Sequence, residues 1–122
     1  MATAPEHKLK ALHNEQFLDL YRLGDGPFVD WAVTVLFYCA MHWMQALAAQ
    51  EGHKIKGYKD EEAVFTGTGV FTPEAYDLYR QLKDDSRDAR YEMKPFSRSD
   101  FEDLQVNFFQ PFRTFIMTRL RV

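Results

Sequence analysis

Arginine and tyrosine side chains crowd the segment Asp85–Tyr91, the part of this chain best suited to bind an anion. Arg87 and Arg90 lie three residues apart, and Tyr91 follows directly. On a helix this spacing places both guanidinium groups on one face, where they could contact one phosphate or two neighbouring phosphates. The segment therefore predicts a phosphate-binding surface, with Arg87 as the group that would stabilise charge on a reacting phosphate.

The predicted helix that carries these arginines has one polar and one apolar face. Thr72 is typical of a helix N-cap, and Pro73 suits the first helical position. The polar and aromatic stripe comprises Tyr76, Arg80, Lys83, Arg87 and Arg90. The opposite side, where a core would lie, carries Leu78, Leu82, Ser86 and Ala89. The alternative to a binding surface is a solvated face whose arginines pair with Asp84, Asp85 and Asp88.

A ladder of polar residues interrupts the apolar body of an earlier helix. It comprises Asp30, Thr34, Tyr38, His42 and Gln45, at spacings of four, four, four and three. Polar groups on a central helix must find partners or line a wet cleft. One interpretation therefore has the ladder facing Arg87 and Arg90 across a cleft, with His42 as the group that takes a proton. The other interpretation puts the ladder on the one exposed face of its helix.

The histidines of the chain do not follow a metal-ligand pattern. They are His7, His13, His42 and His53. Neither a His-x3-His nor a Glu-x2-His spacing occurs, and the pair Cys39 and His42 stands without a second pair. We therefore expect no metal site and no cofactor.

Start and stop signals divide the chain into four or five helices. The predicted helices run from Thr3 to about Leu23, over Phe28–Glu51, Asp60–Phe65 and Pro73–Tyr91, and from Ser99 to about Leu120. Thr3–Glu6 and Ser99–Glu102 are typical of capping boxes, and Gly24–Pro27 is expected to end the first helix. Pro111 should kink or split the last helix. Because no segment alternates with period two, we predict an all-α, antiparallel bundle of four to five helices.

Length, charge and cysteine content limit the possible classes of protein. At 122 residues the chain can bury one core, so we expect a single domain over residues 1–122. The net charge of −3 excludes binding of nucleic acid by bulk electrostatics and leaves only a local patch. The single cysteine, Cys39, indicates a reducing, cytoplasmic setting. Trp31–Ala49 approaches the length of a membrane span, but its polar residues favour a buried bundle helix and no membrane.

Aromatic residues make up 16% of the chain, more than so small an interior is expected to cover. The last predicted helix carries a stripe of them at helical spacing. The stripe comprises Phe101, Leu104, Phe108, Phe112 and Phe115. We therefore expect a homodimer that packs helix to helix through Phe101–Leu120 and buries on the order of 1,000 Å² or more.

Three groups of residues, taken together, support a resemblance to a known family. They are His13-Asn14, the run Asp30–Tyr38 followed by His42, and Ser86–Tyr91. In these the chain resembles the HEPN superfamily (higher eukaryotes and prokaryotes nucleotide-binding), above all its small bacterial stand-alone members, from about His7 to Leu120. The resemblance implies an up-and-down helical bundle, often dimeric, with metal-independent RNA cleavage or RNA binding in defence or toxin–antitoxin systems.

The catalytic motif of HEPN ribonucleases, an arginine followed four to six residues later by a histidine, is not evident after Arg87 or Arg90. Only His42 and His53 could then take the 2′-hydroxyl proton. Two functions stay open: an RNA- or nucleotide-binding domain with possible cleavage, and a non-catalytic dimeric accessory or antitoxin-like subunit that binds a protein partner. The candidate RNA- or nucleotide-binding residues are Arg87, Arg90, Tyr91, Arg80, Lys83, Tyr38, Asp30, His53 and Lys54.

Overall fold

The computed structural model of the chain describes residues 2–22 and 27–122. Its elements are α1 (Ala4–Arg22), α2 (Val29–Gln50), α3 (Tyr58–Gly67), α4 (Pro73–Tyr91), α5 (Arg98–Leu104), the π-helical turn η1 (Gln105–Phe109) and α6 (Gln110–Met117). The last three follow one another directly and form one continuous helix. The described part of the chain is therefore all-α, with five helices and no strand, which confirms the predicted fold class.

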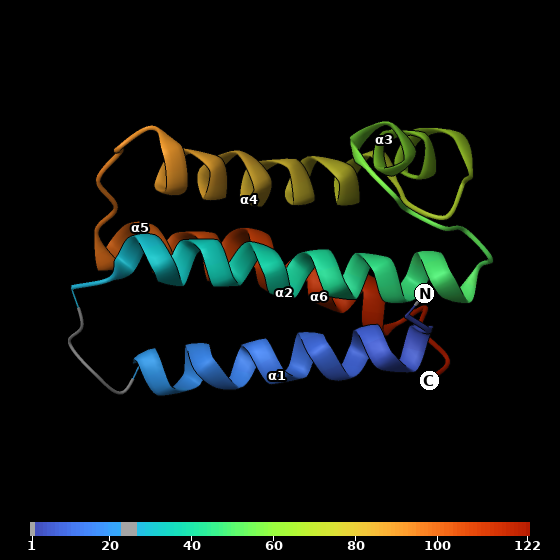
Figure 1. Ribbon diagram of the computed structural model, residues 1–122, viewed down its shortest axis with the longest axis horizontal. Coiled ribbons are helices and arrows are strands. Elements are labelled where there is room, and N and C mark those ends of the chain that lie inside the picture. The colour runs from blue at the N-terminus through green and yellow to red at the C-terminus, as the bar shows by residue number, and fades with distance from the viewer. Residues whose placement is uncertain (1, 23–26) are drawn as a thin grey trace.

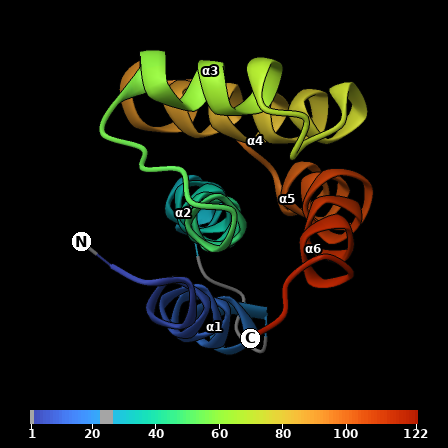
Figure 2. The ribbon, with the colours of Figure 1, turned by 90° about the vertical axis from the view of Figure 1, so that its right-hand side faces the viewer.

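The long helices run up and down around a central helix, α2. Figure 1 shows α1 on one side of α2 and α4 on the other, each antiparallel to it, with the α5–α6 helix behind. The short helix α3 crosses over α4 (Figure 2). Seen end-on in Figure 2, α2 has α1 below it, α4 above it and the α5–α6 helix beside it. No described helix covers the fourth side of α2.

The sequence of α2 explains its central place. Trp43, Met44 and Cys39 are fully buried, and most other residues of the helix are buried as well. Among the described helices, α2 is the one that is long and apolar enough to cross a membrane, yet 67% of its most apolar window is buried by the rest of the chain. The other helices thus provide the apolar surroundings that this helix requires.

The predicted helix ends agree with the structure at several points. Thr3 and Glu6 exchange hydrogen bonds between side chain and backbone, so the first capping box is confirmed. After α2, the backbone N–H groups of Gly52 and His53 donate to Ala49 and Ala48, and Gly52 has a φ of 82°. This is a Schellman motif, and glycine suits its left-handed position. Of the turn predicted at Gly24–Pro27, residues 24–26 lie outside the described part of the chain, as does Leu23.

Two predicted boundaries need correction. The capping box predicted at Ser99–Glu102 is wrong: the structure places the box two residues earlier, where Ser97 and Asp100 exchange side-chain and backbone hydrogen bonds. Aspartate at the third helical position serves as well as glutamate because its carboxylate reaches back to the N-cap N–H. The short third helix is longer than predicted, Tyr58–Gly67 instead of Asp60–Phe65.

The effect predicted for Pro111 takes the form of a π-helical turn. Proline has no backbone N–H and crowds the carbonyl one turn earlier, so a regular α-helix cannot pass through it unchanged. In η1 the helix widens just before the proline, and the N–H of Gln110 donates to Gln105 five residues back. The helix is therefore divided into two α-helical parts around η1, without a break in the chain.

The aromatic stripe predicted to form a dimer surface lies inside the fold. Phe101, Phe109 and Phe112 are buried against α2 and α4, and Phe115 is half-buried against the same core. Phe112 and Phe65 both pack on the ring of Tyr79. A single chain therefore covers most of these rings, while Val106 and Met117 are exposed apolar residues of the same segment. The homodimer stays a prediction.

A buried polar cluster fastens α3 to α4. The hydroxyl of Tyr79 donates to one oxygen of Glu61 at 3.0 Å, and the ammonium of Lys83 donates to the other at 2.7 Å. The side chains of Lys83 and Glu61 are 18% and 11% exposed, so both charges are largely removed from water. Burial and the nearby carboxylate raise the pKa of Tyr79 well above its usual range, which keeps its hydroxyl a donor. Lys83 also lies 4.1 Å from the ring centroid of Tyr58 at the start of α3.

We expect Glu61→Ala to lower the free energy of unfolding by about 3 kcal/mol, because Lys83 and Tyr79 would lose their shared acceptor while staying buried. Thermal denaturation followed by circular dichroism should show a Tm lower by roughly 10 °C. Glu62→Ala, at the exposed neighbouring position, is the matched control and should leave the Tm nearly unchanged. Equal melting of both variants would show that the cluster does not stabilise the fold.

Candidate functional site

A pocket of about 250 Å³ lies between the first turns of α2 and the last turn of α4. Its lining consists of Asp30, Trp31, Thr34, Ala89, Arg90 and Tyr91. The helices place these residues together because α2 and α4 are antiparallel, so the start of one lies beside the end of the other. Three of them, Asp30, Arg90 and Tyr91, are binding residues predicted from the sequence.

Arg90 is held in position by groups on both helices. Its Nη1 donates to the hydroxyl of Tyr38 on α2 at 3.1 Å, and its Nε donates to the carbonyl of Ser86 at 3.2 Å. The guanidinium carbon lies 5.0 Å from the ring centroid of Tyr91 and 5.8 Å from that of Tyr38. These contacts fix the guanidinium group before any ligand arrives, and they leave three of its five N–H groups for other acceptors.

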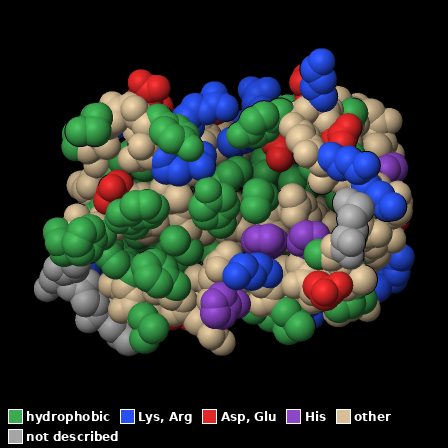
Figure 3. Space-filling model, in the orientation of Figure 1, with side chains coloured by type: hydrophobic (Ala, Val, Ile, Leu, Met, Phe, Trp, Pro, Cys, Tyr) green, Lys and Arg blue, Asp and Glu red, His purple; other side chains and the backbone are tan. Residues whose placement is uncertain are grey.

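Two exposed aromatic rings border this pocket. Trp31 is 57% exposed and Tyr91 is 69% exposed, which is unusual for rings of this size. Hydrophobic side chains gather over the N-terminal half of α2, between α1 and α4, on the face seen in Figure 3. The pocket thus combines a fixed cation with open aromatic surface and one carboxylate, that of Asp30.

The other residues of the predicted cationic stripe are not all free to bind. Lys83 is engaged with Glu61, and Arg80 stacks on the ring of Tyr76 with 5.0 Å to the centroid. Arg87 is exposed and makes no hydrogen bond or ion pair within the described part of the chain. Among the described residues of this stripe, Arg90 lines the pocket and exposed Arg87 lies one helical turn before it on α4.

The alternative that the sequence left open, pairing of the arginines with nearby aspartates, is not what the structure shows. Lys94 pairs with Asp85 and Asp88, at 4.0 Å and 3.8 Å. Asp85 also accepts a hydrogen bond from Gln81. Asp85 and Asp88 thus find partners other than Arg87 and Arg90, and exposed Asp84 makes no ion pair with either arginine among the described residues.

His42 faces a histidine of α1 and does not line the pocket. Its Nδ1 lies 3.1 Å from Nδ1 of His7, close enough for a hydrogen bond in which one nitrogen donates and the other accepts. Burial, reinforced by the neighbouring His7, lowers the pKa of His42 to about 4. Burial also lowers the pKa of His7. Both rings are therefore neutral near pH 7. The predicted polar ladder does not face one site: Asp30 and Thr34 line the α2–α4 pocket, whereas His42 pairs with His7.

His53 and Lys54 lie at the far end of α2 from Arg90. They line a different pocket, of about 430 Å³, together with His7 and Gln45. The structure therefore does not bring them to the arginines with which the sequence analysis grouped them. In residues 2–22 and 27–122, no group of three or more histidine, cysteine or acidic side chains is placed to hold a metal ion.

Sequence reasoning missed Trp31 as a pocket residue and missed a polar cluster deeper in the bundle. There Glu15 accepts hydrogen bonds from Trp43 at 2.6 Å and from Arg113 at 3.0 Å, and the guanidinium of Arg113 also lies over the Trp43 ring. These three residues are far apart in the sequence. One signal was present: a lone glutamate on the inner face of α1 requires a partner when buried.

The histidine pair should make the protein less stable in mild acid. The pKa of His42 is about 4 in the folded chain and near 6.5 when exposed, so the unfolded chain binds more protons between these values. The free energy of unfolding should therefore fall as the pH is lowered from about 6.5 to about 4. In urea denaturation across this range, His42→Gln should show a shallower fall than the wild type. His13→Gln, at an exposed position, should keep the wild-type slope; identical slopes for all three proteins would contradict the assignment.

No protein-family model, curated protein or solved structure matches this chain. The resemblance to the HEPN superfamily therefore depends on the residues quoted above.

Proposed function

We propose that this protein binds single-stranded RNA or a nucleotide at the pocket between α2 and α4. The observation that carries the proposal is the fixed guanidinium of Arg90 in a pocket that two exposed rings, Trp31 and Tyr91, also line. Proteins that bind unpaired nucleotides combine cationic groups for the phosphate with aromatic rings on which a base stacks. The HEPN resemblance points to the same class of ligand.

Each polar group of the pocket has a place in this proposal. The free N–H groups of Arg90 contact a phosphate, and exposed Arg87, one helical turn earlier, contacts the next one along the strand. A base stacks on Trp31 or Tyr91. The carboxylate of Asp30 accepts a hydrogen bond from a ribose hydroxyl or from an N–H at the base edge.

The arrangement favours binding over cleavage. Metal-independent cleavage of RNA needs a group beside the phosphate to take the 2′-hydroxyl proton. No histidine lines this pocket among the described residues, His42 is paired with His7, and His53 lies at another pocket. We therefore propose a binding function and assign no catalytic role to Arg87 or His42.

At least one of Trp31→Ala and Tyr91→Ala should weaken RNA binding, because one stacking ring contributes about 1–3 kcal/mol per base. This corresponds to a loss of affinity of roughly 5- to 150-fold, measurable by fluorescence anisotropy with a labelled single-stranded oligonucleotide in low salt. Affinity should also fall with rising salt, with a slope that reflects about two phosphate contacts.

Leu20→Ala is the matched control for this experiment, because Leu20 is an exposed apolar residue of α1 that lies outside the pocket. Its affinity should equal that of the wild type. If the wild type binds neither RNA nor nucleotide at low salt, or if both ring variants bind as the wild type does, the proposal is wrong.

A second candidate function, contact with a second copy or a partner protein, is favoured by one observation on the open side of α2. Phe28, Trp31, Val35 and Tyr38 follow one another at spacings of three, four and three. The first two are 61% and 57% exposed, and the other two are half-buried. With Tyr91, the exposed rings offer about 350 Å² per chain, a large part of what each partner contributes to a stable interface.

Phe28→Ser separates the two candidates, since Phe28 lies outside the α2–α4 pocket. If the open side of α2 pairs two copies, sedimentation at micromolar concentration should show a wild-type dimer and a Phe28→Ser monomer with unchanged helical content. RNA affinity should survive this substitution if the pocket of one chain suffices. A monomeric wild type would remove the homodimer and leave only a different protein as partner.

A further inference from the structure

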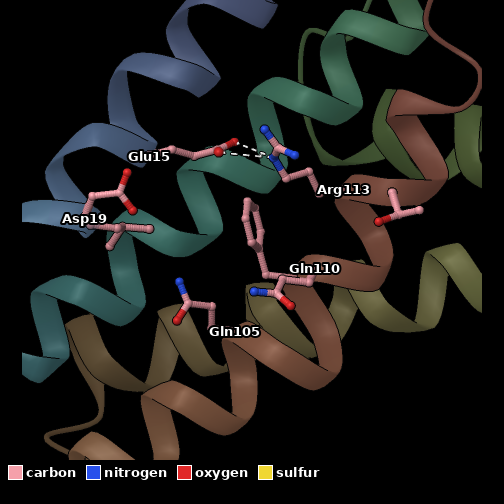
Figure 4. A pocket seen from close by; sticks show the side chains of 8 residues that line it. Glu15, Asp19, Gln105, Gln110 and Arg113 are labelled. Carbon is pink, nitrogen blue, oxygen red and sulfur yellow. Dashed lines mark hydrogen bonds and ion pairs between the residues drawn. The ribbon is translucent and has the colours of Figure 1, made fainter. Parts of the chain in front are cut away.

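A third pocket, of about 340 Å³, lies between α1, η1 and α6 and includes the Glu15–Arg113 pair described above. Its polar lining residues come from two sides, as Figure 4 shows: Glu15 and Asp19 from α1, and Gln105, Gln110 and Arg113 from the continuous C-terminal helix. The volume falls within the range of small-molecule sites.

In this pocket Glu15 and Arg113 form an ion pair with each other. Both oxygens of Glu15 accept from Nε of Arg113, at 3.1 and 3.0 Å, and one of them also accepts from Trp43 at 2.6 Å. Nη1 of Arg113 donates to the sulfur of Met117. The two charges cancel, so neither gives the pocket a net charge.

Asp19 therefore leaves the pocket with one uncompensated negative charge. Its carboxylate is exposed and makes no hydrogen bond or ion pair within the described part of the chain. A carboxylate only accepts hydrogen bonds, so a matching ligand must donate them. A cationic donor provides both the hydrogen and the opposite charge.

Gln105 is the second observation that points to a ligand. The residue is 7% exposed, and its side-chain amide has no hydrogen-bond partner among the described residues. The amide borders the pocket and keeps some contact with it, so water or a ligand can take the place of a protein partner. In Figure 4 the amides of Gln105 and Gln110 lie across the pocket from Asp19. Their carbonyl oxygens are further acceptors for a donor placed between the helices.

The local backbone explains why the two amides lie together. In the π-helical turn the N–H of Gln110 donates to Gln105, so the backbone groups of these residues are joined across one wide turn. Functional sites frequently contain a turn of this kind. Leu18 and Phe109 complete the lining with apolar surface.

We propose that this pocket binds a small organic cation, an alkylammonium or alkylguanidinium group, between Asp19 and the amides of Gln105 and Gln110. Asp19 accepts two of the N–H groups of the cation, and the amide oxygens accept others. Leu18 and Phe109 contact the alkyl chain. The cation comes either from a free amine or from a lysine or arginine side chain of another protein. The site shares no residue with the α2–α4 pocket, so its test is independent of the proposed RNA binding.

The test is a titration of the full chain followed by two-dimensional NMR of side-chain amides. The probes are agmatine and 1,4-diaminobutane as free amines, a capped tripeptide with a central arginine as a protein side chain, and glutarate as an anionic control. Either cationic type should shift the signals of Gln105 and Gln110 in a saturable way, whereas glutarate should not. Saturation by the amines alone identifies a free amine as the ligand, and saturation by the peptide alone identifies a partner's side chain.

Asp19→Asn should weaken the binding of the cationic probe at least 10-fold. Asp77→Asn, which removes the same charge from an exposed position on α4, is the matched control and should bind as the wild type does. No saturable shift from any cation up to about 10 mM, or equal affinity of Asp19→Asn and the wild type, would overturn the proposal.

Gln105→Met provides a second readout that a merely structural glutamine would not give. The substitution keeps the length of the side chain and removes the amide, so the Tm should stay the same or rise. Affinity for the probe should nevertheless fall at least 5-fold. A lower Tm with unchanged affinity would show that the amide serves the fold and not a ligand.

Discussion

The burial of α2 is the constraint on which the rest of the structure depends. A helix so apolar must be surrounded, and α1, α4 and the α5–α6 helix do so on three sides. The fourth side stays open, so residues along its edge are half-buried: Tyr38 supports Arg90, and His42 meets His7. At such half-buried positions neighbouring residues fix the side chain, while one side of it stays accessible to a ligand. A side chain in a fully covered core would not be accessible.

Polar groups between the helices connect elements that apolar packing alone would leave free to slide. Glu15 contacts both Trp43 and Arg113, and so joins α1, α2 and α6 at one level of the bundle. Glu61 does the same for α3 and α4 through Lys83. In each cluster the carboxylate oxygens have donors. Among the described residues, the buried hydroxyl of Ser86 has no hydrogen-bond partner; the amide of Gln105 also has none, but it borders the pocket between α1 and the C-terminal helix.

Local signals allowed the sequence to predict the helices, since caps, glycines and prolines act within a few residues. Thr3 and Thr72 cap their helices as predicted, and α2 ends close to the predicted Glu51, beside Gly52. The direction of a side chain depends instead on the neighbouring helix, which pattern alone does not show. Lys83 was predicted to lie on a binding surface, because the sequence does not show that α3 places Glu61 next to the Lys83 ammonium group. The Phe101–Leu120 stripe was assigned to a dimer for a similar reason: its periodicity predicts an apolar face but not what covers it.

The π-helical turn also sets the phase of the C-terminal helix. Each residue of an α-helix advances by about 100°, and a π-helical turn accommodates one residue more than an α-helical turn would. Every side chain after η1 is therefore rotated by about that angle from where a regular helix would place it, Arg113 included. Loss of a single residue between Gln105 and Phe109 would move Arg113 away from Glu15, although neither residue had changed. In this segment the number of residues is thus as strongly constrained as their identity.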